Sequence, residues 1–278
     1  MAMAFVVLLA LAYGSSHARW ADAAALQGFL DLQRPFVESV SGRLVHFGDP
    51  VPFAVIGAAL ASVALARGRP RMSLLVITLL GLTSVSSQLL KALLAYPRAE
   101  GQIAEAHVAP AAFPSGHATA AMTLAIALVV VVPARLRPAA AVVGAALALG
   151  VSFSIVSLGW HLPSDVLAGF LLATGWALVL LGALRTADRK LPERSGRNRL
   201  SSTTRAAVEG AAAIGLTALV AVGAALAATL TVTLLAFLLP EVVDYAQEHT
   251  AFFVVAGAIA VSAMALLAGV AGVLARRG

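Results

Sequence analysis

The sequence contains no cysteine, which excludes disulfide bridges and thiolate metal sites. Charged residues are also scarce: they make up 12% of the 278 residues, and hydrophobic residues make up 60%. A soluble domain carries about 25% charged residues, so the composition predicts an integral membrane protein. The net charge of +6 does not indicate a nucleic-acid partner here, because the arginines lie in short loops between apolar runs, where they orient membrane proteins.

Apolar runs divide the first two thirds of the chain into candidate membrane helices. Six such runs are present, at residues 1–13, 51–66, 72–95, 114–132, 139–160 and 163–184. The first is short, and the Gly14-Ser15-Ser16 sequence after it leaves a cleaved signal peptide as the alternative to a membrane helix. Residues 19–50 mix aromatic and charged side chains, which is typical of helices that lie at the membrane interface.

The last third of the chain begins with a basic linker, residues 185–205, followed by apolar runs at 206–239 and 251–275. The run at 206–239 is longer than the roughly 20 residues that one crossing needs, so it fits one tilted helix or two short spans. We expect an all-α integral membrane protein with a six-helix core (1–184), a cytoplasmic linker and a two-span hairpin (206–278). Small residues in the hairpin favour close helix packing, within a homo-oligomer or against a partner.

Basic residues are distributed unevenly over the loops. If the chain crosses the membrane eight times, fourteen of its 19 lysines and arginines lie on one side. The other five, Arg19, Arg34, Arg43, Lys91 and Arg98, lie on the opposite side. We expect the protein to lie in the plasma membrane. The positive-inside rule then predicts that both termini face the cytoplasm. Splitting the 206–239 run would move the two C-terminal arginines outside, which favours one helix there.

The stretch Pro114-Ser115-Gly116-His117 lies where a polar loop becomes an apolar run. Proline fits the first turn of a helix, so we expect a helix to begin at Pro114. The free N–H groups of a first helical turn favour an anion such as phosphate. Ser115 and Gly116 can donate hydrogen bonds to its oxygens, and His117 can transfer a proton near neutral pH. Alone, the stretch fits an ordinary capped helix better than an anion site.

Two further clusters of ionisable residues lie at the predicted outer ends of neighbouring spans. Lys91 and Arg98 can balance phosphate charge, and Asp165 follows His161 at a spacing of four. Separately, Lys91 fits an interfacial lysine, and the His161–Asp165 pair fits a helix cap. Together with Pro114 to His117, the clusters suggest phosphoryl transfer, in which one histidine attacks phosphorus and the other protonates the leaving oxygen. No carboxylate pair or His-Glu-x-x-His spacing is available to hold a metal. We expect no cofactor.

These clusters resemble the three-part signature of the type 2 phosphatidic acid phosphatase superfamily, whose pattern is K-x6-R-P, P-S-G-H and S-R-x5-H-x3-D. Residues Lys91 to Arg98 match the first part, with Ala99 in place of the proline. Residues Pro114 to His117 match the second part in full. The third part, Ser154 to Asp165, keeps the serine, histidine and aspartate, but Ile155 stands in place of the arginine.

The resemblance implies a metal-independent membrane phosphatase that acts on a lipid phosphate or diphosphate, of the polyprenyl or glycerolipid class, at the outer face. His161 is then the nucleophile that forms a phosphohistidine, Asp165 orients it, and His117 is the general acid. Four residues bind the phosphate in this scheme: Lys91, Arg98, Ser115 and Gly116.

Two alternatives to hydrolysis stay open: a lipid phosphotransferase and, because of Ile155, a non-catalytic relative that binds a lipid or a partner. An isoleucine donates no hydrogen bond, and losing a donor that stabilises the transition state costs about 10²-fold or more in rate. Arg34 and Arg43 lie on the predicted outer side and are candidates to replace the arginine, although the sequence does not place them near Ser115.

Overall fold

A computed structural model of the chain describes residues 1–32, 34–95, 108–190, 245 and 247–275. These ranges contain helices and loops and no strand, and the prediction of an all-α membrane protein is confirmed. The helices are α1 (Ala2–Gly14), α2 (Ser16–Asp31), α3 (Pro35–Leu44), η1 (Val45–Gly48), α4 (Pro50–Ala66), α5 (Pro70–Leu93), α6 (Gly116–Val131), η2 (Ala134–Leu136), α7 (Arg137–Ser157), α8 (Pro163–Lys190) and α10 (Thr250–Ala275).

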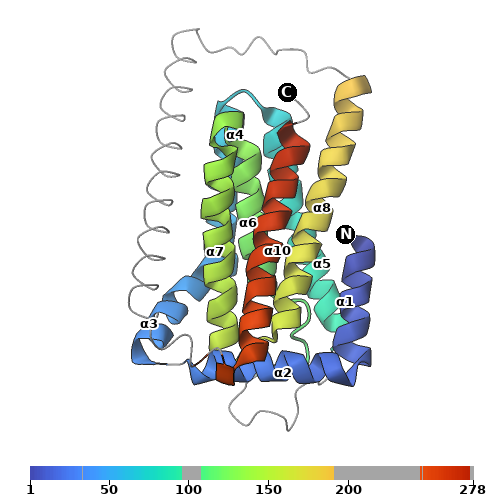
Figure 1. The fold of residues 1–278 in the computed structure, drawn as a ribbon. Helices are drawn as coiled ribbons and strands as arrows, with labels where there is room; N and C mark the ends of the chain where they lie inside the picture. Colours follow the sequence, from blue (N-terminus) through green and yellow to red (C-terminus); the bar gives the residue numbers. More distant parts are fainter. Residues whose placement is uncertain (33, 96–107, 191–244, 246, 276–278) are drawn as a thin grey trace.

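The bundle is built around α6. The other long helices, α4, α5, α7, α8 and α10, all contact α6, and α2 lies across one end of the bundle (Figure 1). Every residue of α6 from Ala118 to Val131 is buried. Residues 118–131 are alanine, threonine, methionine and branched aliphatic residues, and a helix that is apolar all round is a buried one. The sequence of α6 therefore places its first turn, with Gly116 and His117, at one end of the bundle core.

Length and composition make α5, α8, α10 and the continuous segment Ala134–Ser157 candidate membrane spans. Two more spans are counted if α1 with α2, bent by 87°, and Pro35–Gly48 with α4, bent by 57°, each form a broken span. All six runs predicted for residues 1–184, and the run at 251–275, are helical. The run at 206–239 lies outside the described residues.

The first helix ends where the chain turns to cross the end of the bundle. Ser15 caps α2 through its Oγ, which accepts the Ala18 N–H at 3.2 Å, and α2 then leaves at 87° to α1. Tyr13, at the end of α1, donates its hydroxyl to Leu94 O at 2.7 Å. The 13 residues of α1 are fewer than the roughly 20 that one crossing needs, and Met1 lies beside Gly175, near the middle of α8.

The last helix belongs to the same hydrophobic core as the first 184 residues. Six side chains of α10 at helical spacing are buried in this core: Phe252, Ile259, Ala263, Leu267, Val270 and Leu274. At its start, His249 Nε2 lies 3.0 Å from Asp31 Oδ2 of α2, and a Cβ on Gly28 would collide with Phe252. Helix α10, which the sequence assigns to a hairpin beyond the core, therefore packs directly on α2, α6, α7 and α8.

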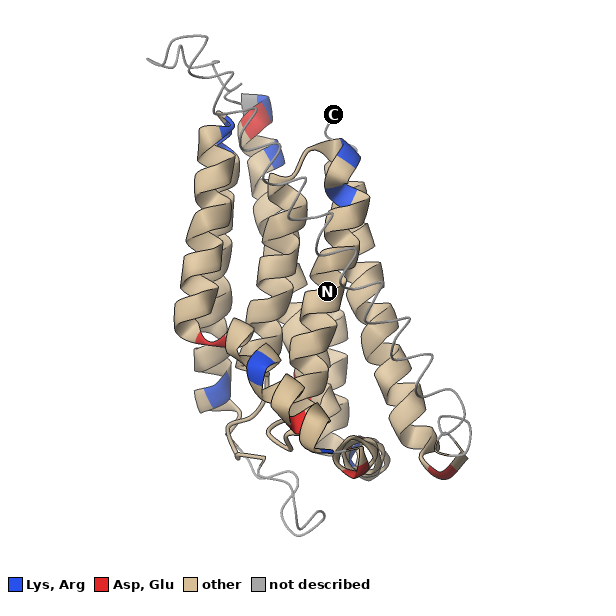
Figure 2. Cartoon of the chain, turned by 90° about the vertical axis from the view of Figure 1, so that its left-hand side faces the viewer, with Lys and Arg blue, Asp and Glu red and all other residues tan. Residues whose placement is uncertain are grey.

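Basic residues gather at the end of the bundle opposite α2 (Figure 2). Among the described basic residues at that end are Arg67, Arg69, Arg71, Arg135, Arg137, Arg185 and Arg189. One of them, Arg71, forms an ion pair with Asp188 at 2.7 Å. The prediction that this end faces the cytoplasm rests on this asymmetry.

Candidate active site

Helix α6 begins at Gly116, so the prediction that Pro114 forms its first turn is wrong by two residues. Ser115 is the N-cap: its Oγ accepts the Ala118 N–H at 3.3 Å. A serine cap fixes the start of a helix more strongly than a preceding proline, because it satisfies one of the unpaired N–H groups. Gly116 and His117 are therefore the first two helical residues, whose backbone N–H groups have no partner within the helix.

The turn from α7 to α8 carries the second histidine. Gly159 has a φ of 71° and ends α7. The Trp160 N–H donates to Ile155 O at 3.0 Å and the Gly159 N–H to Val156 O at 2.9 Å, which is the hydrogen-bond pattern of a Schellman motif. Ending the helix in this way requires a residue in the left-handed backbone conformation, which glycine adopts readily. His161 follows this turn, two positions before Pro163, the first residue of α8.

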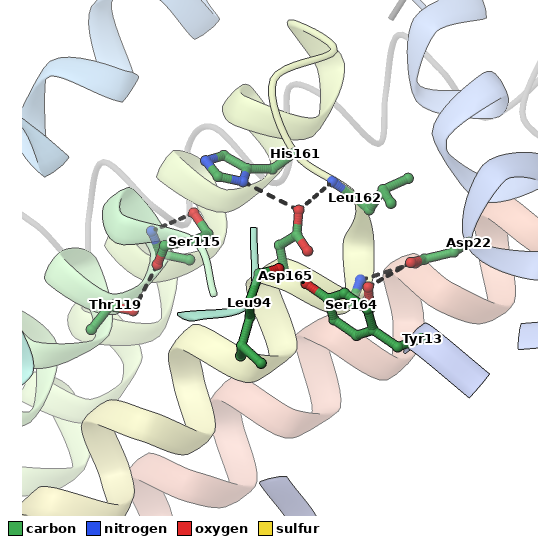
Figure 3. Close-up of polar contacts among 10 residues, drawn as sticks. Tyr13, Asp22, Leu94, Ser115, Thr119, His161, Leu162, Ser164 and Asp165 are labelled. Atoms are coloured by element: carbon green, nitrogen blue, oxygen red, sulfur yellow. Dashed lines mark hydrogen bonds and ion pairs between the residues drawn. The ribbon is translucent and has the colours of Figure 1, made fainter. Parts of the chain in front are cut away.

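His161 and Asp165 form the pair that the sequence predicted. His161 Nδ1 lies 3.3 Å from Asp165 Oδ2, and the same oxygen accepts the Leu162 N–H at 3.0 Å (Figure 3). Asp165 is fully buried and His161 is 6% exposed. The carboxylate thus caps α8 and orients the imidazole at once. Because Nδ1 faces the carboxylate, Nε2 is the ring nitrogen left free of this contact.

A backbone contact joins the His161 turn to the start of α6. The Ser115 N–H donates to Asp165 O at 3.0 Å. A Cβ on Gly169, one turn further along α8, would lie 2.9 Å from Thr119 N and 3.0 Å from Ser115 O. Only a glycine allows the two helices this approach, and it brings together the second and third sequence clusters.

Lys91 brings the first cluster to the same place. It lies in the last turn of α5, and a Cβ built on Gly116 would be 3.6 Å from Lys91 Nζ. Lys91 also interacts electrostatically with Asp165. Arg98 lies outside the described residues, so its phosphate-binding role stays a prediction.

His117 is held by residues that the sequence did not single out. Its Nε2 lies 3.2 Å from Asp49 Oδ1, and its ring centroid is 6.0 Å from that of Trp160. A Cβ on Gly48 would lie within 3.0 Å of three His117 atoms, so Gly48 lets the chain pass against the first turn of α6. His117 also interacts electrostatically with His161 and Lys91, which places all three clusters in one site.

Asp49 connects His117 to a third histidine. Its other oxygen, Oδ2, lies 2.7 Å from His46 Nδ1. The hydrogen bond with His46, and a smaller contribution from His117, hold the pKa of the Asp49 carboxyl below its usual value, while burial opposes the shift. Asp49 is therefore an anion at neutral pH. The sequence feature that could have drawn attention to Asp49 is its place directly before Pro50, the first residue of α4.

Asp22, from the helix that crosses the end of the bundle, supports the start of α8. Its Oδ1 accepts the Ser164 N–H at 2.9 Å and its Oδ2 accepts the Ser164 hydroxyl at 2.5 Å (Figure 3). Asp22 is 9% exposed. It satisfies an unpaired N–H of the first turn of α8 and so fixes the residue next to Asp165.

A cavity of about 550 Å³ opens beside His117, between α4, α5 and α6. One part of its wall is polar, with Lys91, Ser87, Gly116 and His117. Another part is apolar, and its members are Phe53, Ala54, Leu80 and Ala120. The cavity therefore offers hydrogen-bond donors and positive charge beside a hydrocarbon-like surface.

Ile155 is fully buried in the hydrophobic core. Of the two arginines considered as replacements, Arg34 donates to Asp31 O at 3.3 Å at the end of α2, and Arg43 is exposed on α3. Within the described ranges no group of three or more histidine, aspartate or glutamate side chains is arranged to hold a metal ion. The expectation that no metal is needed stays a prediction.

Comparison with known proteins identifies the family. The pattern of the PAP2 superfamily matches residues 1–189. The fold is similar to the crystal structure described as the first transmembrane PAP2 type phosphatidylglycerolphosphate phosphatase from Bacillus subtilis. The TM-score is 0.53 at 24% identity, over 68% of this chain and 96% of that one. A search of the curated proteins found no match. The match over residues 1–189, with the converged clusters and the apolar helices, shows that the chain belongs to the PAP2 superfamily as a multi-pass membrane protein.

Proposed function

We propose that this protein is a lipid phosphate phosphatase that works through a phosphohistidine on His161. The observation that carries the proposal is the convergence of His161–Asp165, His117–Asp49 and Lys91 around the first turn of α6. Each element supplies one requirement of phosphoryl transfer: an oriented nucleophile, a proton donor and a positive charge beside free backbone N–H groups.

The reaction has two steps. In the first, His161 Nε2 attacks phosphorus, the bond from phosphorus to the lipid oxygen breaks, and His117 gives its proton to that oxygen. In the second, His117 takes a proton from water, the resulting hydroxide attacks the phosphohistidine, and orthophosphate leaves. Asp165 holds the tautomer of His161 that leaves Nε2 free. Asp49 stabilises the imidazolium form of His117, the form that donates a proton.

The cavity supports a lipid as the substrate. A lipid phosphate has a charged head and an apolar tail, and the wall of the cavity changes from Lys91 and His117 to Phe53 and Leu80. The similar solved protein is described as acting on phosphatidylglycerolphosphate, which makes this glycerolipid one candidate. Polyprenyl diphosphate is the other, because a site at the outer face suits the recycling of envelope lipids.

The outer face is part of the proposal. It is supported by the arginines gathered at the far end of the bundle from His161, since basic loops remain in the cytoplasm.

A phosphate-release panel tests the function. Purified protein in detergent, with a chelator present, is offered phosphatidylglycerolphosphate, phosphatidate and a polyprenyl diphosphate. We expect release from at least one lipid and a loss of at least about 10³-fold in His161→Ala, because the nucleophile is removed. His17→Ala, which changes an exposed histidine of α2, is the matched control and keeps full activity. Equal release by His161→Ala and wild type contradicts the proposal, as does a need for added metal.

A further inference from the structure

Ser87 is a buried polar residue that the proposed mechanism does not use. It lies on α5, one helical turn before Lys91, and is 2% exposed. In the part of the chain that the structure describes, its Oγ is buried and has no hydrogen-bond partner. Most buried hydroxyls have a partner, because leaving one unsatisfied is costly. A hydroxyl left in this state beside a ligand cavity suggests a partner that arrives with the ligand.

The Ser87 hydroxyl lies beside Lys91 at the wall of the cavity. Ser87 and Lys91 both line the cavity, on the same face of α5. A Cβ on Gly116 would lie 3.6 Å from Lys91 Nζ and 4.0 Å from Ser87 Oγ. The ammonium group, the hydroxyl and the first turn of α6 therefore surround one small volume beside Gly116, where the backbone N–H groups of an unbonded helical turn are available.

We propose that Ser87 binds the phosphate, with its hydroxyl donating a hydrogen bond to a phosphoryl oxygen held between Lys91 and the start of α6. This inference rests on the proposed function for the identity of the ligand. It gives the site a neutral donor in addition to Lys91, in a chain that carries Ile155 where the family pattern has an arginine.

Two other buried hydroxyls without a partner among the described residues provide a comparison. Ser152 lies on α7 and Thr174 on α8. Thr174 is nine residues beyond Asp165 on the same helix, about 13 Å along its axis. Ser87 differs from Thr174 because it lines the cavity together with Lys91 and Gly116.

Binding of inorganic phosphate tests the inference without requiring turnover. The melting temperature of the purified full chain is measured against orthophosphate concentration, since a ligand that binds the folded state raises it. We expect Ser87→Ala to need about tenfold more phosphate than wild type for the same shift, as for the loss of one hydrogen bond to a charged group. Without phosphate, Ser87→Ala melts no lower than wild type, because no hydrogen bond within the protein is lost.

Two variants control this measurement. Ser84→Ala removes an exposed hydroxyl from the same cavity and helix, and Thr174→Val removes a buried hydroxyl that does not line the cavity. Both should bind phosphate as wild type does. Equal phosphate dependence of Ser87→Ala and Ser84→Ala overturns the inference, and so does a weakening in Thr174→Val as large as in Ser87→Ala.

Turnover separates this inference from the proposed function. With the lipid that wild type hydrolyses, Ser87→Ala should lower kcat/KM by about 10- to 10²-fold and raise the inhibition constant of orthophosphate. If wild type binds phosphate through Ser87 but hydrolyses no lipid phosphate, the proposed function fails while the binding role stands. If wild type turns over and Ser87→Ala equals it in both constants, the binding role fails and the proposed function stands.

Discussion

We predict that Gly169→Ala lowers the activity of the site, although Gly169 is not one of the proposed substrate-binding residues. Gly169 lies on the face of α8 that meets the first turn of α6. The added Cβ would lie 2.9 Å from both Thr119 N and Thr119 Oγ1, and 3.0 Å from Ser115 O. Two of these three atoms belong to the backbone, so no side-chain rotation removes the collision.

The distances set the size of the effect. Ordinary contact begins at 3.4 Å, so α6 and α8 must separate by about 0.5 Å, from 2.9 to 3.4 Å. This separation stretches the hydrogen bond from Ser115 N to Asp165 O and moves His117 away from His161. A misplacement of 1 Å can cost about 10²-fold in rate, so half of that is expected to cost on the order of tenfold in kcat. Overpacking should also lower the free energy of unfolding by about 1–3 kcal/mol.

The assay is steady-state hydrolysis of the preferred lipid phosphate, together with a melting curve. Gly182→Ala is the matched control: it lies on the same helix, and its Cβ would meet nothing within 4 Å. We expect this control to keep full activity and to melt no lower than wild type, since alanine favours a helix. Full activity in Gly169→Ala would refute the claim that this close approach aligns the two histidines.

Three further results are expected. Asp49→Asn should lower kcat about tenfold and leave KM nearly unchanged, because the proton donor loses its anion, whereas Asp188→Asn at the far end of the bundle should stay within about twofold. A larger change in KM than in kcat would show that Asp49 acts on binding. Gly159→Ala should cost about 1–2 kcal/mol of stability, measured as a lower melting temperature, because its φ is 71°; an unchanged melting temperature would contradict the assigned turn. In intact cells, an impermeant maleimide should label Phe47→Cys and not Ala134→Cys, and the reverse pattern would refute the outward-facing site; the chain has no other cysteine.

The membrane helices could be predicted because each is an uninterrupted apolar run. The buried helix α6 and the long helix α8 lie close to the expected ranges of 114–132 and 163–184. The start of α6 was misplaced because the proline rule and the serine cap compete within two residues, and the side-chain hydrogen bond of Ser115 decides the outcome. The angle between α1 and α2 could not be read from composition, since it depends on the cap at Ser15.

Contacts within the site could be predicted from the sequence only where the two residues are close together in the chain. Asp165 follows His161 by four positions across the start of α8, so their contact follows from local geometry. The contact between Asp49 and His117 spans 68 positions and depends on how η1 packs against α6.

The contact between Asp22 and Ser164 spans 142 positions and depends on α2 crossing the end of the bundle. Neither this pair nor Asp49–His117 forms a sequence motif, because the two residues of each pair come from elements whose relative position is determined only by the packed structure.

Trapping the phosphoenzyme tests the central claim most directly, since the account assigns the phosphoryl group to His161. Wild type is mixed with a lipid whose terminal phosphate is radiolabelled and is quenched in alkali, which preserves phosphohistidine. We predict label on the peptide that contains His161 and no label in His161→Ala. In His117→Ala the label should form more slowly and, once formed, be lost more slowly than in wild type, because both steps lose their proton-transfer group. Label on His117, or undiminished label in His161→Ala, would contradict the account.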